Sequence, residues 1–213
     1  MRIVGELLAR QFLERADRGR YRPGLAVRSL AFSSNNDSAV TARARAELKR
    51  LVDATGETAH YAMYDAGASV YVDKVDGLHP VRSYTRIGGR SPSYATATGK
   101  ALLAWQPAAE IKRVAHKAAA FNALTHVTLE AIENDARLVR ARGYAINRGE
   151  WREGVWGIAA PIFGPDGNVI AAFGLSGPEA RIRPRLKVYT ALVLQHAARI
   201  SAPPPAALAK RSS

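Results

Sequence analysis

The chain has 213 residues and a mass of 23.0 kDa, with 47% hydrophobic residues, a formal net charge of +13 and no cysteine. A chain of this size and apolar content can bury roughly 70% of its unfolded surface, so we expect a folded core rather than disorder. The lack of cysteine excludes disulfide frameworks, thiolate metal sites and cysteine nucleophiles. No apolar run suits a signal peptide or a membrane span, so we expect a cytoplasmic protein without a membrane partner.

The positive charge gathers at the two ends of the chain. Residues 1–28 contain seven Arg and three acidic residues, and residues 181–213 contain seven basic residues and no acidic one. Cationic ends favour a polyanion such as DNA as a partner, because Lys and Arg release counterions when they bind phosphates. The alternative interpretation is a charge that serves only solubility.

The first elements in chain order predict a helix followed by a hairpin. Residues 2–10 have helical spacing of apolar residues, and a turn-prone segment at 16–19 separates two short extended segments. This pattern is typical of a recognition helix with a β-hairpin wing, although any amphipathic helix and hairpin on a basic protein would look the same. The arginines that we expect to contact DNA are Arg2, Arg15, Arg18, Arg20 and Arg22.

The rest of the chain alternates helical and extended patterns. We expect helices at 25–32, 37–55, 95–105, 107–114, 128–143 and 186–200. We expect strands at 58–64, 69–75, 81–87, 155–163 and 169–176. Thr128 and Gly143 are residue types that begin and end helices, and residues 164–168 suit a turn between two paired strands. Hairpin-joined strands with helices around them predict an α+β fold with a largely antiparallel sheet.

Motifs for catalysis are incomplete in this sequence. Residues 98–100 resemble the end of a phosphate-binding loop, but Tyr94 stands where that loop needs glycine. Residues 174–178 resemble a nucleophile elbow until Pro178 replaces the last glycine. The five histidines lack metal-binding spacing, and we interpret them as surface or packing residues. We therefore expect no enzyme, no catalytic residue, no metal and no cofactor.

One helix start and two strands form a candidate site for a small molecule. The amides of Thr96, Ala97 and Thr98 open a predicted helix, where N–H groups lack intrahelical partners and can bind a carboxylate. Small residues at alternating positions of the facing strands would leave a hollow, for which ordinary strand packing with glycine bulges is the alternative. The strand residues that we assign to this hollow are Trp156, Gly157, Gly174 and Ser176.

Seven ordered segments resemble a known family. They are residues 12–15 with 19–22 (FLER, GRYR), 55–58 (TGET), 71–75 (YVDKV), 95–104 (ATATGKALLA), 142–144 (RGY), 154–155 with 158–162 (GV, IAAPI), and 176–178 (SGP). Together they resemble the isocitrate lyase regulator (IclR) family of bacterial transcriptional regulators, from about residue 2 to residue 200. The resemblance implies homodimers or homotetramers on operator DNA, with a small organic acid as effector.

The resemblance also implies a domain plan. Residues 1–23 would be a partial winged helix-turn-helix, residues 24–36 a linker helix, residues 37–200 a GAF-like effector-binding domain, and residues 201–213 a disordered tail. The first helices of the family's DNA-binding domain have no counterpart here. Either the natural start lies upstream of Met1, or the chain is a natural remnant that senses the effector. The expected function is a ligand-responsive transcriptional regulator, and the alternative is a stand-alone sensor module that does not bind DNA.

The family's effector pocket can be carried over onto this sequence. It implies contacts from residues 96–98, Asn147, Gly157, Gly174 and Ser176. Family members that bind small keto acids resemble one another in having an acidic residue at the position of Asn147, a Cys at that of Gly157 and a Ser at that of Gly174. The replacements here predict a roomier and less polar cavity for a larger or aromatic acid, although Trp151 and Trp156 add bulk nearby. Tyr94 replaces a common His and is expected to line the mouth.

Overall fold

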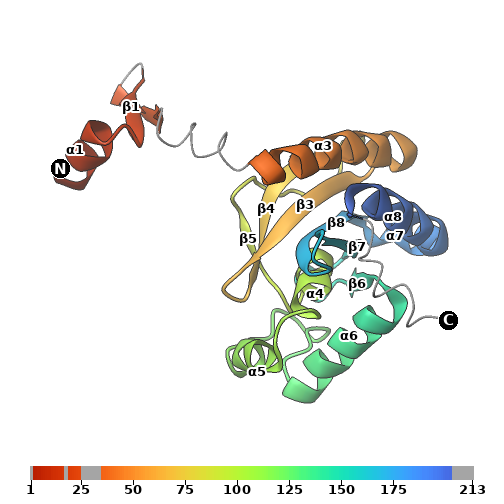
Figure 1. Cartoon of the computed structure of the whole chain (residues 1–213). Coiled ribbons are helices and arrows are strands. Elements are labelled where there is room, and N and C mark those ends of the chain that lie inside the picture. Colours follow the sequence, from red (N-terminus) through yellow and green to blue (C-terminus); the bar gives the residue numbers. More distant parts are fainter. Residues whose placement is uncertain (1, 17–18, 25–34, 203–213) are drawn as a thin grey trace. The chain divides into compact units, whose positions relative to one another are not determined.

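The computed structural model describes residues 2–16, 19–24 and 35–202, which divide into two compact units, residues 1–42 and residues 43–213 (Figure 1). Most of the linker helix expected at 24–36, the tail from residue 203 and the predicted DNA contact Arg18 lie outside the described residues. For Arg2 the structure describes the backbone only.

The first unit contains a helix and a hairpin, as the sequence predicts. Helix α1 (Arg2–Ala9) precedes strands β1 (Leu13–Arg15) and β2 (Tyr21–Pro23), which pair antiparallel. Glu14 lies opposite Arg22, and their side chains form an ion pair of 2.7 Å. The amide of Gly24 also donates to the carbonyl of Phe12, which extends the hairpin by one bond.

The second unit is built on one six-stranded sheet in which every neighbouring pair is antiparallel. The strand order is β5 (Arg90–Pro92), β4 (Ala68–Val75), β3 (Thr58–Asp65), β8 (Val169–Pro178), β7 (Val155–Phe163) and β6 (Ala145–Arg148). Two hairpins, β3–β4 and β7–β8, are joined at the centre where β3 pairs with β8. The α+β prediction is confirmed, and the two edge strands are the shortest of the six.

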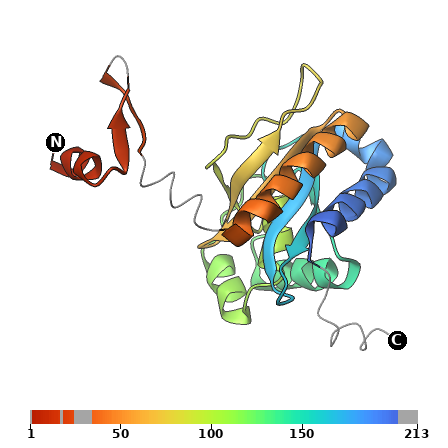
Figure 2. The same ribbon diagram turned by 45° about the horizontal axis from the view of Figure 1, so that its top comes forward.

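Helices cover both faces of this sheet. They are α3 (Asn35–Thr55), α4 (Ala97–Leu103), α5 (Ala108–His116), α6 (Leu129–Arg142), α7 (Glu179–Ile182), the 3-10 turn η2 (Arg183–Arg185) and α8 (Leu186–Ile200). Figures 1 and 2 show α3 and α8 over one face, and α4 over the other, with α5 and α6 packed outside α4. The predicted caps are confirmed at α6, where the hydroxyl of Thr128 accepts from the Ala131 amide and Gly143 has φ 79°.

The two faces are packed with different kinds of residue. The face under α3 and α8 buries large side chains such as Leu48, Leu51 and Phe173. The face under α4 buries small ones, because Ala97 and Ala101 pack against Ala159 and Ala172 of the strands. Small side chains let α4 lie close to the sheet. The cavity described below lies at the start of this helix.

The strand expected at 81–87 is wrong. The structure has no strand there, and the third extended segment is β5, at residues 90–92. Val81, Tyr84 and Ile87 have the residue types of a strand, but 56–73% of each side chain is exposed. The carbonyls of this segment accept from side chains instead of a neighbouring strand: Val81 from Arg181, Ser83 from Thr58, and Tyr84 from Arg152.

Candidate functional site

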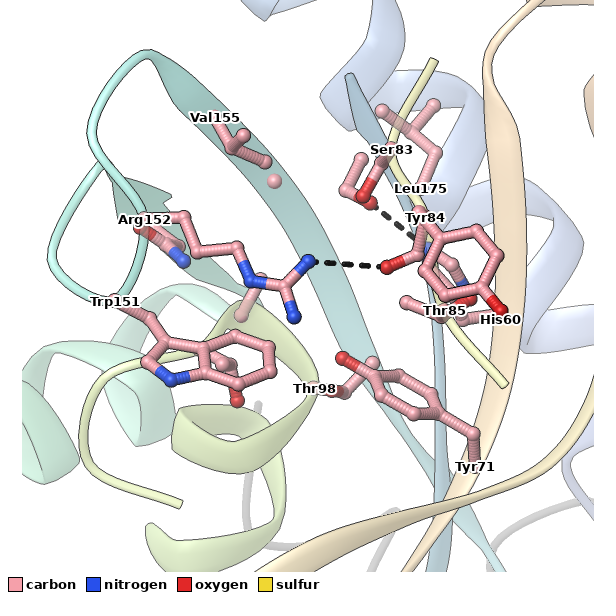
Figure 3. A pocket seen from close by; sticks show the side chains of 15 residues that line it. His60, Tyr71, Ser83, Tyr84, Thr85, Thr98, Trp151, Arg152, Val155 and Leu175 are labelled. Atoms are coloured by element: carbon pink, nitrogen blue, oxygen red, sulfur yellow. Dashed lines mark hydrogen bonds between the residues drawn. The ribbon is translucent and has the colours of Figure 1, made fainter. Parts of the chain in front are cut away.

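A cavity lies between the start of α4, the central strands and the loop that joins β6 to β7 (Figure 3). The space open to the centre of a water molecule is about 30 Å³, which accommodates roughly two waters. Its fifteen lining residues are His60, Tyr71, Ser83, Tyr84, Thr85, Thr96, Ala97, Thr98, Asn147, Trp151, Arg152, Val155, Gly157, Leu175 and Ser176.

The start of α4 presents free main-chain donors to this cavity. Thr96 is the N-cap, and its hydroxyl accepts from the Gly99 amide at 3.2 Å. Within the described residues, the amides of Ala97 and Thr98 donate no hydrogen bond to another protein group. Unpaired amides in the first turn of a helix favour an anion, because the N–H groups and the helix dipole both attract negative charge. Small side chains here let a ligand approach the backbone closely.

A buried histidine forms a polar part of the cavity wall. His60 is 3% exposed, and its Nε2 lies 2.8 Å from the Ser176 hydroxyl, while its Nδ1 lies 3.3 Å from the Thr85 hydroxyl. Burial lowers the pKa of His60 to about 3, and the charge of Lys74 adds to that shift. His60 is therefore neutral near pH 7 and a weak base. The pair with Ser176 suits hydrogen bonding to a ligand better than proton abstraction.

Asn147 lines the cavity, but its polar atoms already have partners. Its Nδ2 donates to the Ala95 carbonyl at 3.0 Å, and its Oδ1 accepts from the amides of Gly149 and Glu150. These bonds fix the β6–β7 loop to the residues just before α4. The structure therefore gives Asn147 a positioning role in addition to its place in the lining.

A buried ion network fixes the same loop from below. Lys100 in α4 is 5% exposed, and its Nζ lies 2.8 Å from Glu150 and 2.9 Å from Asp135. Asp135 in α6 also pairs with His126 at 2.8 Å. Removal of one partner would leave buried charge uncompensated, so these pairs hold α4, α6 and the loop in one arrangement. Residues 149–154 are thereby placed over the cavity.

Two residues of the loop close the mouth of the cavity. Figure 3 shows the Arg152 guanidinium pointing across the cavity, where its Nη1 donates to the Tyr84 carbonyl at 3.1 Å. The guanidinium carbon lies 4.3 Å from the centre of the Trp151 ring, in cation–π contact. In the described part of the chain, no Asp or Glu lines this cavity. The site therefore has positive electrostatic character.

Six of the nine predicted effector contacts line the cavity: Thr96, Ala97, Thr98, Asn147, Gly157 and Ser176. The other three lie elsewhere. The Tyr94 hydroxyl donates to the Ala119 carbonyl, and Trp156 lies beneath Arg148. A Cβ on Gly174 would lie 2.1 Å from the Ile158 carbonyl oxygen, so strand packing requires this glycine. For Gly174 the packing alternative is the better account.

The cavity is narrower than the sequence predicts. Gly157 leaves little room of its own, since a Cβ there would lie 3.2 Å from the Leu175 carbonyl oxygen and 3.3 Å from Ala97. Trp151 and Arg152 also reach into the cavity from the loop (Figure 3). Tight packing at this strand and the two long side chains at the mouth together keep the cavity small.

Comparison with known proteins decides the family. Residues 33–202 match the family model described as the C-terminal domain of the bacterial transcriptional regulator IclR. The chain belongs to the IclR family. Members are transcriptional regulators with a C-terminal effector-binding domain, which corresponds to the sheet and helices of the second unit. The resemblance read from the seven sequence segments is confirmed.

Individual IclR-family proteins extend this finding. The regulator KdgR of Escherichia coli is 38% identical over 161 residues, which are 73% of this chain and 59% of KdgR. The chain thus spans about three fifths of that relative's length. The IclR structure from Thermotoga maritima has a TM-score of 0.74 at 25% identity and covers 93% of this chain and 82% of its own. An IclR homologue from Microbacterium hydrocarbonoxydans, solved with 4-hydroxybenzoate, has a TM-score of 0.81 at 22% identity, with coverage of 100% and 85%.

Nine of the fifteen lining residues were not predicted as ligand contacts, among them His60, Tyr71 and Arg152. These three come from β3, β4 and the β6–β7 loop, which the fold brings together. Tyr71 belongs to segment 71–75, which carries part of the family resemblance but by itself does not indicate a pocket.

The remaining predictions concern contacts to DNA, metal binding and membrane association. Arg15 and Arg20 are exposed on the hairpin of the first unit, and Arg22 pairs with Glu14. In the described ranges, no group of three or more His, Asp or Glu side chains is arranged to hold a metal ion. No helix within those ranges is long and apolar enough to cross a membrane.

Proposed function

We propose that this chain senses a small organic acid in the cavity at the start of α4, and that the acid changes how the regulator binds operator DNA. The observation that carries the proposal is the chemistry of the cavity wall. It combines two unpaired helix-start amides, the cation of Arg152 and a neutral His60, with no acidic side chain among the described lining residues. Such a wall favours a carboxylate over a neutral or cationic ligand.

The size of the acid depends on the loop side chains. The present space suits a ligand no larger than roughly two waters, whereas the Microbacterium relative carries 4-hydroxybenzoate. Arg152 is exposed, and residues 83–85 belong to no strand, so both can move aside without opening the sheet. We propose that an aromatic acid enters by displacing Arg152 from Tyr84.

The proposed DNA contacts are the hairpin arginines of the first unit, which include the exposed Arg15 and Arg20. Their charge would position the regulator on phosphates, while a homodimer or homotetramer would present two or more such units. The acid would act by population shift, because it can change DNA affinity only by preferring one of two arrangements of the assembly.

Calorimetry tests the sensor proposal. The purified chain is titrated with benzoate, 4-hydroxybenzoate, pyruvate and glyoxylate at pH 7.5. We expect saturable binding of at least one acid, with the aromatic acids stronger than the two keto acids. If no acid binds, the sensor proposal is wrong; if only pyruvate or glyoxylate binds, the preference for aromatic acids is wrong.

A second candidate is a sensor module that acts through protein partners without DNA. It is favoured by the cavity, whose described lining residues all belong to the second unit. A gel-shift assay with the upstream intergenic DNA separates the two, using this chain and an N-terminally extended version. Retardation that changes when acid is added supports the regulator. The absence of retardation for both versions supports the stand-alone module.

A further inference from the structure

Arg152 differs from other arginines of the second unit in having no acidic partner while it faces a cavity. Arg181 lies 2.5 Å from Glu57, and Arg45 lies 2.7 Å from Asp73. Arg152 forms no ion pair with a described carboxylate, and its hydrogen bond is to the Tyr84 carbonyl. Its charge is thus balanced by one main-chain dipole, one indole ring and solvent.

Arg152 and the start of α4 line the same cavity. Figure 3 shows the Tyr71 ring facing the same space as Thr98 and the Arg152 guanidinium. Burial raises the pKa of Tyr71, and the opposing influences are hydrogen bonds to Ser91 and Thr98 and the charge of Arg152. A hydrogen bond from Thr98 and the positive charge of Arg152 thus both favour the ionised form of the Tyr71 hydroxyl. A carboxylate in this cavity would share the space lined by Tyr71, Thr98 and Arg152.

The chemistry of guanidinium suits this position. Arg presents five N–H donors in a planar fork that matches the two oxygens of a carboxylate. When an entering acid displaces Arg152 from the Tyr84 carbonyl, as proposed above, the donor that this bond uses also becomes available to the ligand. The Trp151 ring beneath limits where the guanidinium can lie, which reduces the ordering that binding requires.

We propose that Arg152 is the specificity-determining residue of the cavity, which selects a carboxylate over its neutral amide by pairing with the ligand at the mouth. This inference rests on the proposed function, since it assumes that the cavity holds an organic acid. It adds that the site distinguishes ligands by their charge. It assigns this selection to Arg152 of the β6–β7 loop.

The test compares isosteric ligands on matched variants. Arg152→Gln removes the charge at the cavity, and Arg148→Gln removes the same charge on β6, where the guanidinium lies 5.9 Å from the Trp156 ring and outside the cavity. Each protein is titrated by calorimetry with 4-hydroxybenzoate and 4-hydroxybenzamide, and with acetate and acetamide. Circular dichroism melting confirms that each variant is folded, which is expected because both side chains are exposed.

Wild type and Arg148→Gln should both prefer the acid of each pair. Arg152→Gln should bind the acids roughly 10- to 100-fold more weakly and lose the preference over the amides, as expected for a lost charge-assisted pair. Arg152→Lys should keep part of the preference, because the charge remains without the fork. If Arg152→Gln still prefers the acids, this inference is wrong while the sensor proposal stands. If wild type binds none of the acids, both proposals are wrong.

Discussion

The two faces of the six-stranded sheet show how one domain separates folding from recognition. Under α3 and α8, Phe173, Leu48 and Leu51 are fully buried and the packing is aliphatic and aromatic. Under the start of α4 the cavity wall includes glycine, alanine, hydroxyl groups, the His60 imidazole and two loop residues. Both faces bury apolar side chains, including Leu102 and Ile132 on the α4 side, but the cavity with its polar wall lies on the second face. Substitutions on the two faces should therefore affect different measurements.

The largest expected effect is on the packed face. Phe173→Ala should lower the free energy of unfolding by about 4 kcal/mol, because it removes a fully buried ring and leaves a cavity against α8. Urea denaturation measures this loss, and acid affinity of the folded protein should stay near that of wild type. A loss below about 1 kcal/mol would contradict the assignment of this face to stability.

A somewhat smaller effect is expected at the ion pair that links α4 to the β6–β7 loop. Lys100→Met should lower the free energy of unfolding by about 3 kcal/mol, because Glu150 would keep a buried charge without its partner. Unlike Phe173→Ala, it should also weaken acid binding, since Glu150 belongs to the loop that carries Arg152. Lys112→Met on the exposed side of α5 is the control and should change neither quantity. Unchanged affinity in Lys100→Met would separate the network from the cavity.

The protonation of His60 should make the free energy of unfolding depend on pH. Its folded-state pKa of about 3 lies below the ordinary value of 6.5. Above pH 6.5 neither state binds the proton, so His60 contributes no slope. As the pH falls from 6.5 to 3, the unfolded state binds a proton that the folded state refuses, and stability falls by up to about 1.4 kcal/mol per pH unit.

His60→Gln should remove this slope, so that the stability lost between pH 7 and pH 5 is roughly 2 kcal/mol smaller than in wild type. Urea denaturation at several pH values provides the measurement. His116→Gln, on the exposed side of α5, should keep the wild-type slope. Equal slopes in wild type and His60→Gln would show that His60 titrates normally in the folded protein.

The smallest expected effect on stability is on the cavity face. A Cβ on Gly157 would lie 3.2 Å from the Leu175 carbonyl and 3.3 Å from Ala97, which is tight but not prohibitive. Gly157→Ala should therefore change the free energy of unfolding by less than about 1 kcal/mol. It should nevertheless weaken acid binding several-fold, because the methyl group projects toward Ala97. Full affinity would place the ligand away from this strand.

The sequence predicted those features that depend on local chemistry. Thr128 and Gly143 cap α6 as expected, and the turn at 164–168 joins β7 to β8. Capping residues, left-handed glycines and turns act over a few positions, so a single sequence contains their signal. The start of α4 was found for the same reason.

Features that depend on contacts between residues far apart in the chain could not be predicted from the sequence. Residues 81–87 have strand-like composition, but side chains from Arg181, Thr58 and Arg152 take the carbonyls that a strand would offer to its neighbour. His60 looked like an ordinary packing histidine, because its partners stand 25 and 116 positions away. Long-range placement also explains why Gly174 was assigned to the hollow, when the β7 backbone leaves no room for a side chain there.

The lengths of the outermost strands have a consequence for self-association. β5 has three residues and β6 has four, whereas the four strands between them have eight to ten. Such short borders offer few free main-chain groups to an incoming strand, so continuous sheets across copies and fibril-like stacking are disfavoured. Pairing of copies in a regulator would then rely on side-chain surfaces, which can separate and re-form without unravelling the sheet.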